Sequence, residues 1–263
     1  MDRRAGTEAA DRAARAALGH AESEAVRQQK VELAAAFRIF GRLGFDLGVA
    51  GHITARHADD PELFWVNPLG RAFMRMRTTD LHLVDHRGRV VEGGQAINHS
   101  AFVIHAHIHQ ALPQVNAVAH AHSPHGVAWS SLGRLLDPIN QNACVFFEDH
   151  VLFDEYFGPV LTDQEGSKIA AALSEADGKG AILRNHGLIT VGGSVPEAAW
   201  WFIAMERAAQ VQLLAESAAT APVPIEPQVA RDARRVSGTP QAGRLGCRPL
   251  LDWILHEEPD LLD

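Results

Sequence analysis

The hydrophobic pattern of the first half of the chain predicts a helix, an antiparallel meander of short strands and a second helix. Apolar residues recur at helical spacing over residues 27–43. A second helix is expected over residues 100–112, where Pro113 stops it, and an apolar strand runs on to His122. Between the two helices, β-type runs bounded by turn-forming residues occur at 52–56, 63–66, 81–84 and 90–91.

The second half of the chain alternates between short apolar runs and helix-start signals. Ser123 followed by Pro124 is typical of a helix N-terminus. Thr162 and Ser194 are each followed three residues later by glutamate, which is the spacing of a capping box. The predicted elements are a short helix over 123–129, apolar pieces at 145–147 and 151–153, a helix over 162–176, a strand–turn–strand unit over 181–191 and a long helix over 194–216, with Ala199, Trp200, Ile203 and Val211 on its apolar stripe.

One α/β domain with arms at both ends is the organisation that this pattern favours. Residues 1–25 are rich in alanine and charge and predict a flexible N-terminal arm. Residues 26–218 form the expected domain. Residues 219–263 shift to Pro, Arg and Gly and end in an apolar group around Trp253. We expect this C-terminal tail to pack on the body or on a neighbouring subunit.

The composition fits a protein that acts on a small molecule. The chain carries 24 Lys and Arg against 32 Asp and Glu, a net charge of −8, which disfavours a nucleic-acid or anionic membrane partner. Two cysteines give no disulfide framework, and no apolar stretch reaches the ~20 residues of a membrane span. We expect a cytoplasmic protein that binds neither nucleic acid nor membrane.

Histidine is the candidate chemistry of this sequence, with 15 copies in 263 residues. His120 and His122 have the same parity on their strand, so both imidazoles should leave one face of the sheet. Two neutral imidazoles can hold one divalent cation when a third ligand arrives from elsewhere. Two core histidines bonded to the backbone are the alternative. His186 lies at a glycine turn, where a side chain can project into a cleft.

The sequence resembles the class II aldolase and adducin family in three motifs, which follow in the expected order over roughly residues 31–215. These are Gly51-His52-Ile53-Thr54-Ala55-Arg56, the pair His120 and His122, and Asn185-His186-Gly187 before the long helix. The resemblance implies a three-layer α/β/α fold with a central, mainly antiparallel sheet, usually assembled as a homotetramer. It also implies a divalent metal held by His120, His122 and His186, with zinc expected and Fe(II) as the alternative.

The sequence departs from the sugar-phosphate aldolases of that family at the catalytic carboxylate. Those enzymes carry an acid/base glutamate on the helix before the paired histidines, and counting back from His120 places Ala101 there. A methyl group cannot transfer a proton. His105 and His109 share a helix face with Ala101 and are the catalytic candidates that could replace the carboxylate. The alternative is that both imidazoles are bonded to the sheet.

The phosphate-binding positions of the family are altered as well. Its Gly-Asn-x-Ser pattern ends here in Thr54 and carries His52 in place of asparagine, and Leu69 stands where a hydroxyl residue is usual. A phosphosugar is therefore disfavoured, and a small oxo- or hydroxy-acid is favoured. The substrate-binding candidates that the resemblance implies are His52, Thr54, Arg56, Asn67, His99 and Ser100.

Three functions are compatible with these residues. The first is a metal-dependent lyase, an aldolase or a decarboxylase, in which the metal stabilises an enolate. Decarboxylation needs no base to begin, so the missing glutamate affects it least. The second is a three-histidine Fe(II) oxygenase that decarboxylates an α-keto acid, like the oxygenases of aminocoumarin biosynthesis. The third is an adducin-like assembly module, which loss of the metal histidines would favour, but all three are present.

Overall fold

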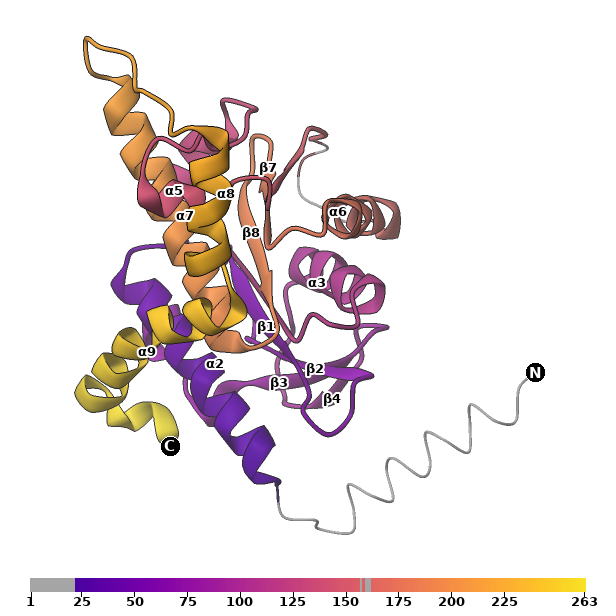
Figure 1. Cartoon of the computed structure of the whole chain (residues 1–263). Helices are drawn as coiled ribbons and strands as arrows, with labels where there is room; N and C mark the ends of the chain where they lie inside the picture. The colour runs from indigo at the N-terminus through magenta and orange to yellow at the C-terminus, as the bar shows by residue number, and fades with distance from the viewer. Residues whose placement is uncertain (1–21, 157, 159–161) are drawn as a thin grey trace.

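A central sheet with helices on both faces organises the part of the chain that the structure describes, which is residues 22–156, 158 and 162–263 (Figure 1). This computed structural model therefore leaves most of the predicted N-terminal arm, residues 1–21, outside the described residues. The strands lie in the order β4-β3-β2-β1-β5-β8-β7-β6, and every neighbouring pair is antiparallel except β6 and β7. The predicted three-layer, mainly antiparallel α/β/α fold is confirmed.

The first four strands form the predicted meander, and the pair that carries the histidine motifs lies at the middle of the sheet. β5 is hydrogen-bonded to β1 on one side and to β8 on the other. The strands are β1 His52–Arg56, β2 Leu63–Val66, β3 His82–Asp85, β4 Val90–Glu92, β5 Ala117–Ala121, β6 Val151–Phe153, β7 Gly180–Leu183 and β8 Gly187–Gly192.

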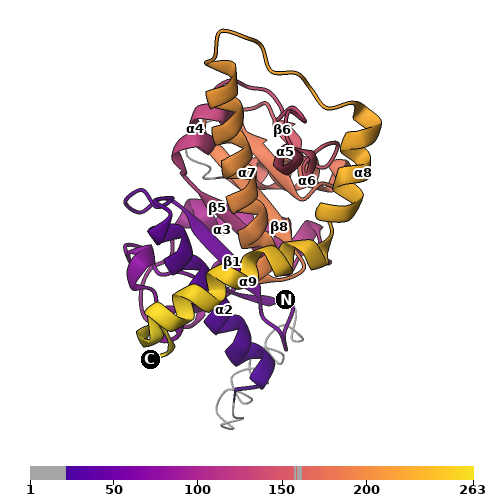
Figure 2. The same ribbon diagram turned by 60° about the vertical axis from the view of Figure 1, so that its left-hand side comes forward.

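The helices divide between the two faces of the sheet, with α3 and α6 on one side and α2, α7 and α9 on the other (Figures 1 and 2). None of the described helices is both long and apolar enough to cross a membrane. The α-helices are α2 Glu24–Arg42, α3 His99–Ala111, α4 Pro124–Ser130, α5 Gln141–Cys144, α6 Asp163–Ala176, α7 Val195–Glu216, α8 Pro227–Ser237 and α9 Pro240–Glu257, and the 3-10 helices are η1 Phe73–Arg75, η2 Thr78–Asp80 and η3 Pro259–Leu262.

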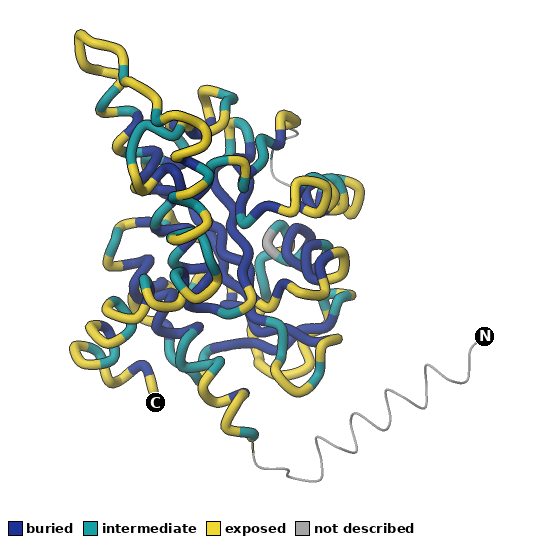
Figure 3. The backbone as a smooth tube through the Cα atoms, viewed as in Figure 1, coloured by how far each residue is buried: buried dark blue, intermediate teal, exposed yellow. Residues whose placement is uncertain are grey.

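The side chains of β5 alternate between two hydrophobic cores. Val118 belongs to the core beneath α3 and α6, together with Ile104. Ala119 faces the other core, where Phe37 of α2 and Phe202 of α7 are fully buried. The small alanine side chains allow α7 to lie close to the sheet, and the central strands are buried throughout (Figure 3). Residues of one parity on this strand, including His120, therefore face the α3 side.

The C-terminal region is more regular than the sequence suggested. Residues 219–263 contain α8 and α9, and α9 packs along α7 and α2 of the same chain (Figure 2). The prolines of this region are compatible with helices, because Pro227 and Pro240 begin them, a position that suits proline since the first N–H needs no partner. The expected apolar group is split, since Ile254 is buried and Trp253 is 40% exposed. Val211, predicted on the buried stripe of α7, is also 40% exposed.

Candidate metal centre

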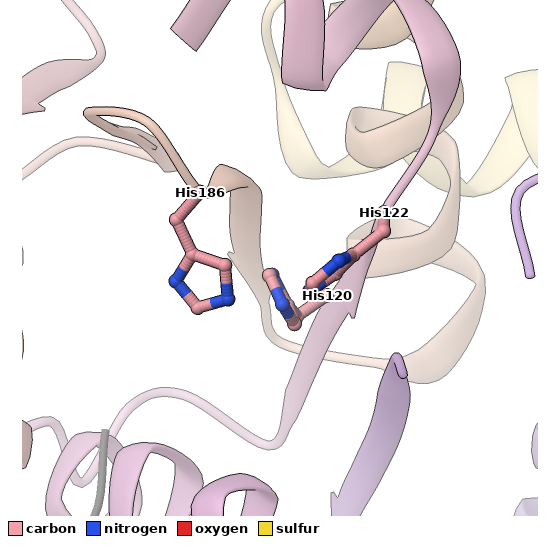
Figure 4. A group of neighbouring side chains, drawn as sticks. All are labelled: His120, His122 and His186. Carbon is pink, nitrogen blue, oxygen red and sulfur yellow. The ribbon is translucent and has the colours of Figure 1, made fainter. Parts of the chain in front are cut away.

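His120, His122 and His186 converge at one end of the two central strands (Figure 4). One candidate ligand atom from each imidazole lies within 4.8 Å of those of the other two. The ring centroids of His120 and His186 are 4.8 Å apart, and His122 lies 5.2 Å from the first and 5.0 Å from the second. The three rings meet edge to face, so their nitrogen atoms can point to a common centre.

The turn that carries His186 is shaped by its neighbours. Residues 184–186 connect β7 to β8, and the backbone N–H of His186 donates to the carbonyl of Leu183 at 3.0 Å. Asn185 takes the left-handed conformation, with φ of 59°, which asparagine tolerates better than most residues. This tight reversal brings the imidazole of His186 over the end of β5, beside His120.

The orientation and charge of His120 are suited to a metal ligand. Its Nδ1–H donates to the carbonyl oxygen of Leu188 at 2.7 Å, which leaves the lone pair of Nε2 for a cation. Burial lowers the pKa of His120 well below its ordinary value, and burial also lowers the pKa of His122. The pKa of His186 falls to about 4 because of burial and, second, the neighbouring His122. All three imidazoles are therefore neutral at pH 7 and can donate a lone pair.

This donor set fits a divalent cation of intermediate softness. Three neutral imidazole nitrogens are the ligands of many zinc sites and are also used by Fe(II). The group found in the described part of the chain contains histidine only, without a carboxylate. A metal held by three protein ligands keeps coordination positions for substrate oxygen atoms. We conclude that these residues can hold a metal in a catalytic rather than a fully closed structural arrangement.

A second group of buried histidines adjoins the candidate centre. His52 of β1 lies directly across from His120 of β5, with ring centroids 5.0 Å apart, and the ring of His105 lies 4.3 Å beyond His52. Three of their ring nitrogens have no hydrogen-bond partner among the described residues. These are Nδ1 and Nε2 of His52 and Nε2 of His105. Buried polar groups are rarely left unpaired, so these nitrogens are available to a substrate or to water.

The imidazoles of His105 and His109 are both hydrogen-bonded to the hydroxyl of Thr54 on β1. The Oγ1 atom of Thr54 lies 2.8 Å from Nδ1 of His105 and 2.9 Å from Nε2 of His109. Burial lowers the pKa of His105 well below its ordinary value, and it lowers the pKa of His109 to about 3, with a smaller contribution from the charge of Arg56. His105 contacts His52, whose ring lies beside that of His120, whereas the contacts of His109 are with Thr54 and Phe64.

The remaining sequence candidates are distributed around this region rather than gathered at the three histidines. The Arg56 guanidinium donates to backbone carbonyls of Pro61, His109, Leu112 and Val115, so it braces the chain around α3. Asn67 is buried, and its Oδ1 has no partner in the described residues. His99 is exposed at the start of α3, and Ser100 follows it. Position 101 lies in the same first turn.

A small hollow opens beside His186. Its walls include the aromatic rings of Phe153 and Tyr156 and the aliphatic Leu183. The charged residues Glu155, Glu165 and Arg184 also line it, and Arg184 is ion-paired to Asp154 at 2.7 Å.

One buried residue next to the histidines was not among the sequence candidates, namely Glu206 of α7. Its side chain is 2% exposed and accepts hydrogen bonds from the segment that follows His122. A signal was available, because Glu206 falls on the same helical stripe as the buried Ala199, Phe202 and Ala209. A carboxylate in that position must be paired when buried.

Comparison with known proteins gives one family and several close relatives. The family model described as "Class II Aldolase and Adducin N-terminal domain" matches residues 31–213. Over 234 residues the chain is 43% identical to "Decarboxylase NovR" of Streptomyces niveus, covering 88% of this chain and 86% of the relative. It is 42% identical to "4-hydroxy-3-prenylphenylpyruvate oxygenase/4-hydroxy-3-prenylbenzoate synthase" of Streptomyces roseochromogenus subsp. oscitans, covering 88% and 83%.

The solved structure of "L-fuculose 1-phosphate aldolase from Glaciozyma antarctica PI12" is similar over nearly the whole chain. Its TM-score is 0.83 at 38% sequence identity, with 93% of this chain and 97% of that chain covered. Enzymes with names from different reaction classes thus share this architecture.

Proposed function

The chain belongs to the class II aldolase and adducin family, and we propose that it is a divalent-metal-dependent enzyme that breaks a C–C bond of a small oxo- or hydroxy-acid. The observation that carries the proposal is the convergence of His120, His122 and His186. A bound divalent ion would supply Lewis-acid stabilisation of the negative charge that develops on a substrate oxygen. A non-catalytic assembly module would not require three histidines that converge on a metal.

Decarboxylation is the cleavage that suits this site best. When a carboxylate that lies β to a carbonyl leaves as CO2, the electron pair of the broken bond passes into an enolate, which then takes up a proton on carbon, so no base is required to begin. The sequence has alanine at position 101, where related sugar-phosphate aldolases carry an acid/base glutamate. The relative with 43% identity is named a decarboxylase. We therefore place decarboxylation ahead of a retro-aldol reaction, which must remove a proton from a hydroxyl group.

The protein side chains of the site would bind and orient the substrate. The unpaired nitrogens of His52 and His105 can hydrogen-bond to substrate oxygen atoms, and Thr54 fixes the ring of His105. These groups are buried, which keeps bulk water away from a reactive enolate. We keep His105 and His109 as candidates for a catalytic role, with His109 acting only through Thr54.

A three-histidine Fe(II) oxygenase acting on an α-keto acid is the second candidate. Two observations favour it, since the candidate ligand group has no carboxylate and a relative with 42% identity is named for the oxygenation of an arylpyruvate. The aromatic wall formed by Phe153 and Tyr156 beside His186 would accept an aryl group. Arylpyruvates are therefore the first α-keto acids to test for the oxygenase.

Metal content and oxygen dependence together test the proposal. Protein purified anaerobically is expected to contain about one zinc or iron per chain. Zinc with CO2 release that does not depend on O2 identifies the decarboxylase, whereas iron with coupled O2 consumption identifies the oxygenase. His186→Ala should lose the metal and the turnover together. Full metal occupancy and turnover in that variant would refute the assignment.

The variant Ala101→Glu distinguishes the decarboxylase from the oxygenase, because it adds a carboxylate at the position where the sugar-phosphate aldolases carry one. We expect it to tighten zinc binding about tenfold and to abolish any O2-dependent turnover, because a fourth protein ligand fills a position that O2 needs. Chelator competition and an oxygen electrode provide the measurements. Gln110→Glu, an exposed position on the same helix, controls for the added charge. Unchanged zinc affinity in Ala101→Glu would mean that position 101 does not face the metal.

We further propose that the protein is a cytoplasmic homo-oligomer, a tetramer as is usual in this family. Both cysteines of the described chain are free and buried, which suits a reducing compartment. Light scattering on the metal-loaded protein measures the assembly, and a monomer would contradict the proposal.

A further inference from the structure

Glu206 is a buried carboxylate whose two oxygen atoms accept hydrogen bonds from one short segment of the chain. Its Oε2 accepts from the Ser123 hydroxyl at 2.6 Å and from the N–H of Gly126 at 2.5 Å. Its Oε1 accepts from the N–H of His125 at 3.0 Å, and Nδ1 of His125 lies 2.8 Å from the same oxygen. All these partners lie within four residues after His122.

This carboxylate performs the capping role that the sequence assigned to Ser123. Ser123 is the N-cap residue of α4, but its side chain accepts no hydrogen bond from the helix, and its hydroxyl donates to Glu206. The free N–H groups of the first turn are satisfied by Glu206, which comes from α7 on the opposite side of the sheet from α3. A negative charge also suits the N-terminal end of a helix.

The helix that Glu206 holds touches both segments that carry the candidate ligands. At its start, α4 is joined to His122 through Ser123 alone. At its end, the carbonyl of Ser130 accepts from the N–H of Asn185 at 3.1 Å, next to His186. Between these points, a Cβ on Gly126 would lie 2.7 Å from the side chain of Leu188, so helix and strand are in close contact. The carbonyl of that same Leu188 orients His120.

We propose that Glu206 is a positioning residue for the metal centre, fixing α4 so that His122 and the His186 turn meet His120 at the spacing that a metal requires. The inference rests on the proposed function only in requiring that the three histidines bind a metal. Glu206 itself is directed at backbone N–H groups and hydroxyl donors, so its effect passes through α4. A residue that merely stabilised the core would change the stability of the fold and leave the metal geometry unchanged.

Glu206→Gln tests this role with little change of shape. Whichever way the amide turns, its NH2 group faces either Gly126 or His125, and the backbone N–H of that residue loses its acceptor. Ser123→Ala is a milder second variant that retains the carboxylate and three donors. Glu197→Gln is the matched control, because Glu197 is also a buried carboxylate of α7 but accepts from the N–H of Gly193 at 3.2 Å, away from the histidines.

Cobalt(II) binding to the full-length protein gives the readout, measured as affinity by chelator competition and as the visible absorption spectrum of the bound ion. Glu206→Gln is expected to weaken cobalt binding by about tenfold or more and to alter the spectrum, because the histidines are then no longer held at the spacing that the ion requires; the loss of a partner bonded directly to a ligand has an effect of this size. Ser123→Ala should shift both in the same direction by less, and Glu197→Gln should match the unmodified protein.

The possible outcomes test the positioning role of Glu206 separately from the metal assignment of the three histidines. If Glu206→Gln folds and binds cobalt with unchanged affinity and spectrum, the positioning role is wrong. If that variant does not fold, Ser123→Ala decides in the same way. Failure of the unmodified protein to bind cobalt, or binding that His186→Ala leaves intact, overturns the metal assignment and this inference with it.

Discussion

Removing the C-terminal partners of Arg38 is expected to lower the free energy of unfolding by about 3 kcal/mol, near the lower end of the cost of breaking a buried ion pair. The Arg38 side chain, on α2, is only 3% exposed. Its guanidinium donates to Glu258 at 2.9 Å, to both carboxylate oxygens of Asp260 at 2.8 and 3.0 Å, and to the carbonyl of Met76 at 2.7 Å. Asp260 is half exposed, which keeps the expected loss at the lower end.

The double variant Glu258→Ala and Asp260→Ala measures this loss by denaturant unfolding. In an Arg38→Met background the same two substitutions should cost less than about 1 kcal/mol, because no buried charge is then left unpaired. Glu257→Ala with Asp263→Ala removes the same charge from exposed neighbours and is the control. An equal loss with and without Arg38 would show that the loss does not arise from the ion pairs of Arg38, since Glu258 also pairs with Arg42.

Local patterns were sufficient for the parts of the site that lie on one strand or one turn. The parity of His120 and His122 follows from the period of a strand, and the turn before Gly187 follows from the residue types of a tight hairpin. The capping box at Thr162 was also correct, since both of its hydrogen bonds are present. Each of these features depends on residues within a few positions of one another.

The features that sequence reasoning missed depend on partners far apart in the chain. The contacts of Arg56, a substrate-binding candidate from the sequence, are with backbone carbonyls up to 59 residues away, which no local pattern indicates. Ser123 looked like a helix cap, but a carboxylate 83 residues later takes its hydroxyl. Arg38 lies within the buried part of α2, and its acidic partners follow more than 200 positions later. The hydrogen-bond and ion-pair partners of these residues can be identified only from the fold.

Acid is expected to destabilise the metal-free protein steeply, by roughly 6 kcal/mol between pH 6.5 and pH 4, through two buried histidines outside the candidate ligand set. Burial lowers the pKa of His109 to about 3 and that of His150 to about 4. In the unfolded chain both take up protons near pH 6.5, so the unfolded state binds more protons throughout this range. Stability is therefore complete above pH 6.5 and is lost as the pH falls, by about 3 kcal/mol for each residue.

His150 is the better of the two histidines for a test of this prediction, because its two backbone hydrogen bonds, one accepted and one donated, together require the neutral imidazole. Its Nε2 accepts from the N–H of Leu136 at 2.9 Å, and its Nδ1–H donates to the carbonyl of Phe146 at 2.6 Å. Among nearby charges, Asp149 and Asp137 raise its pKa and Lys179 lowers it, but burial is the largest effect.

We expect His150→Gln, whose amide can make both of these hydrogen bonds, to reduce the slope of unfolding free energy against pH near pH 5 by about 1.4 kcal/mol per pH unit, the contribution of one proton. His256→Gln is the control, because that side chain is exposed on α9 and solvated in the folded and unfolded states alike. Urea unfolding of the metal-free protein at pH 7, 6, 5 and 4.5 gives both slopes. An unchanged slope in His150→Gln would show that His150 is not one of the groups that must stay neutral for the chain to fold.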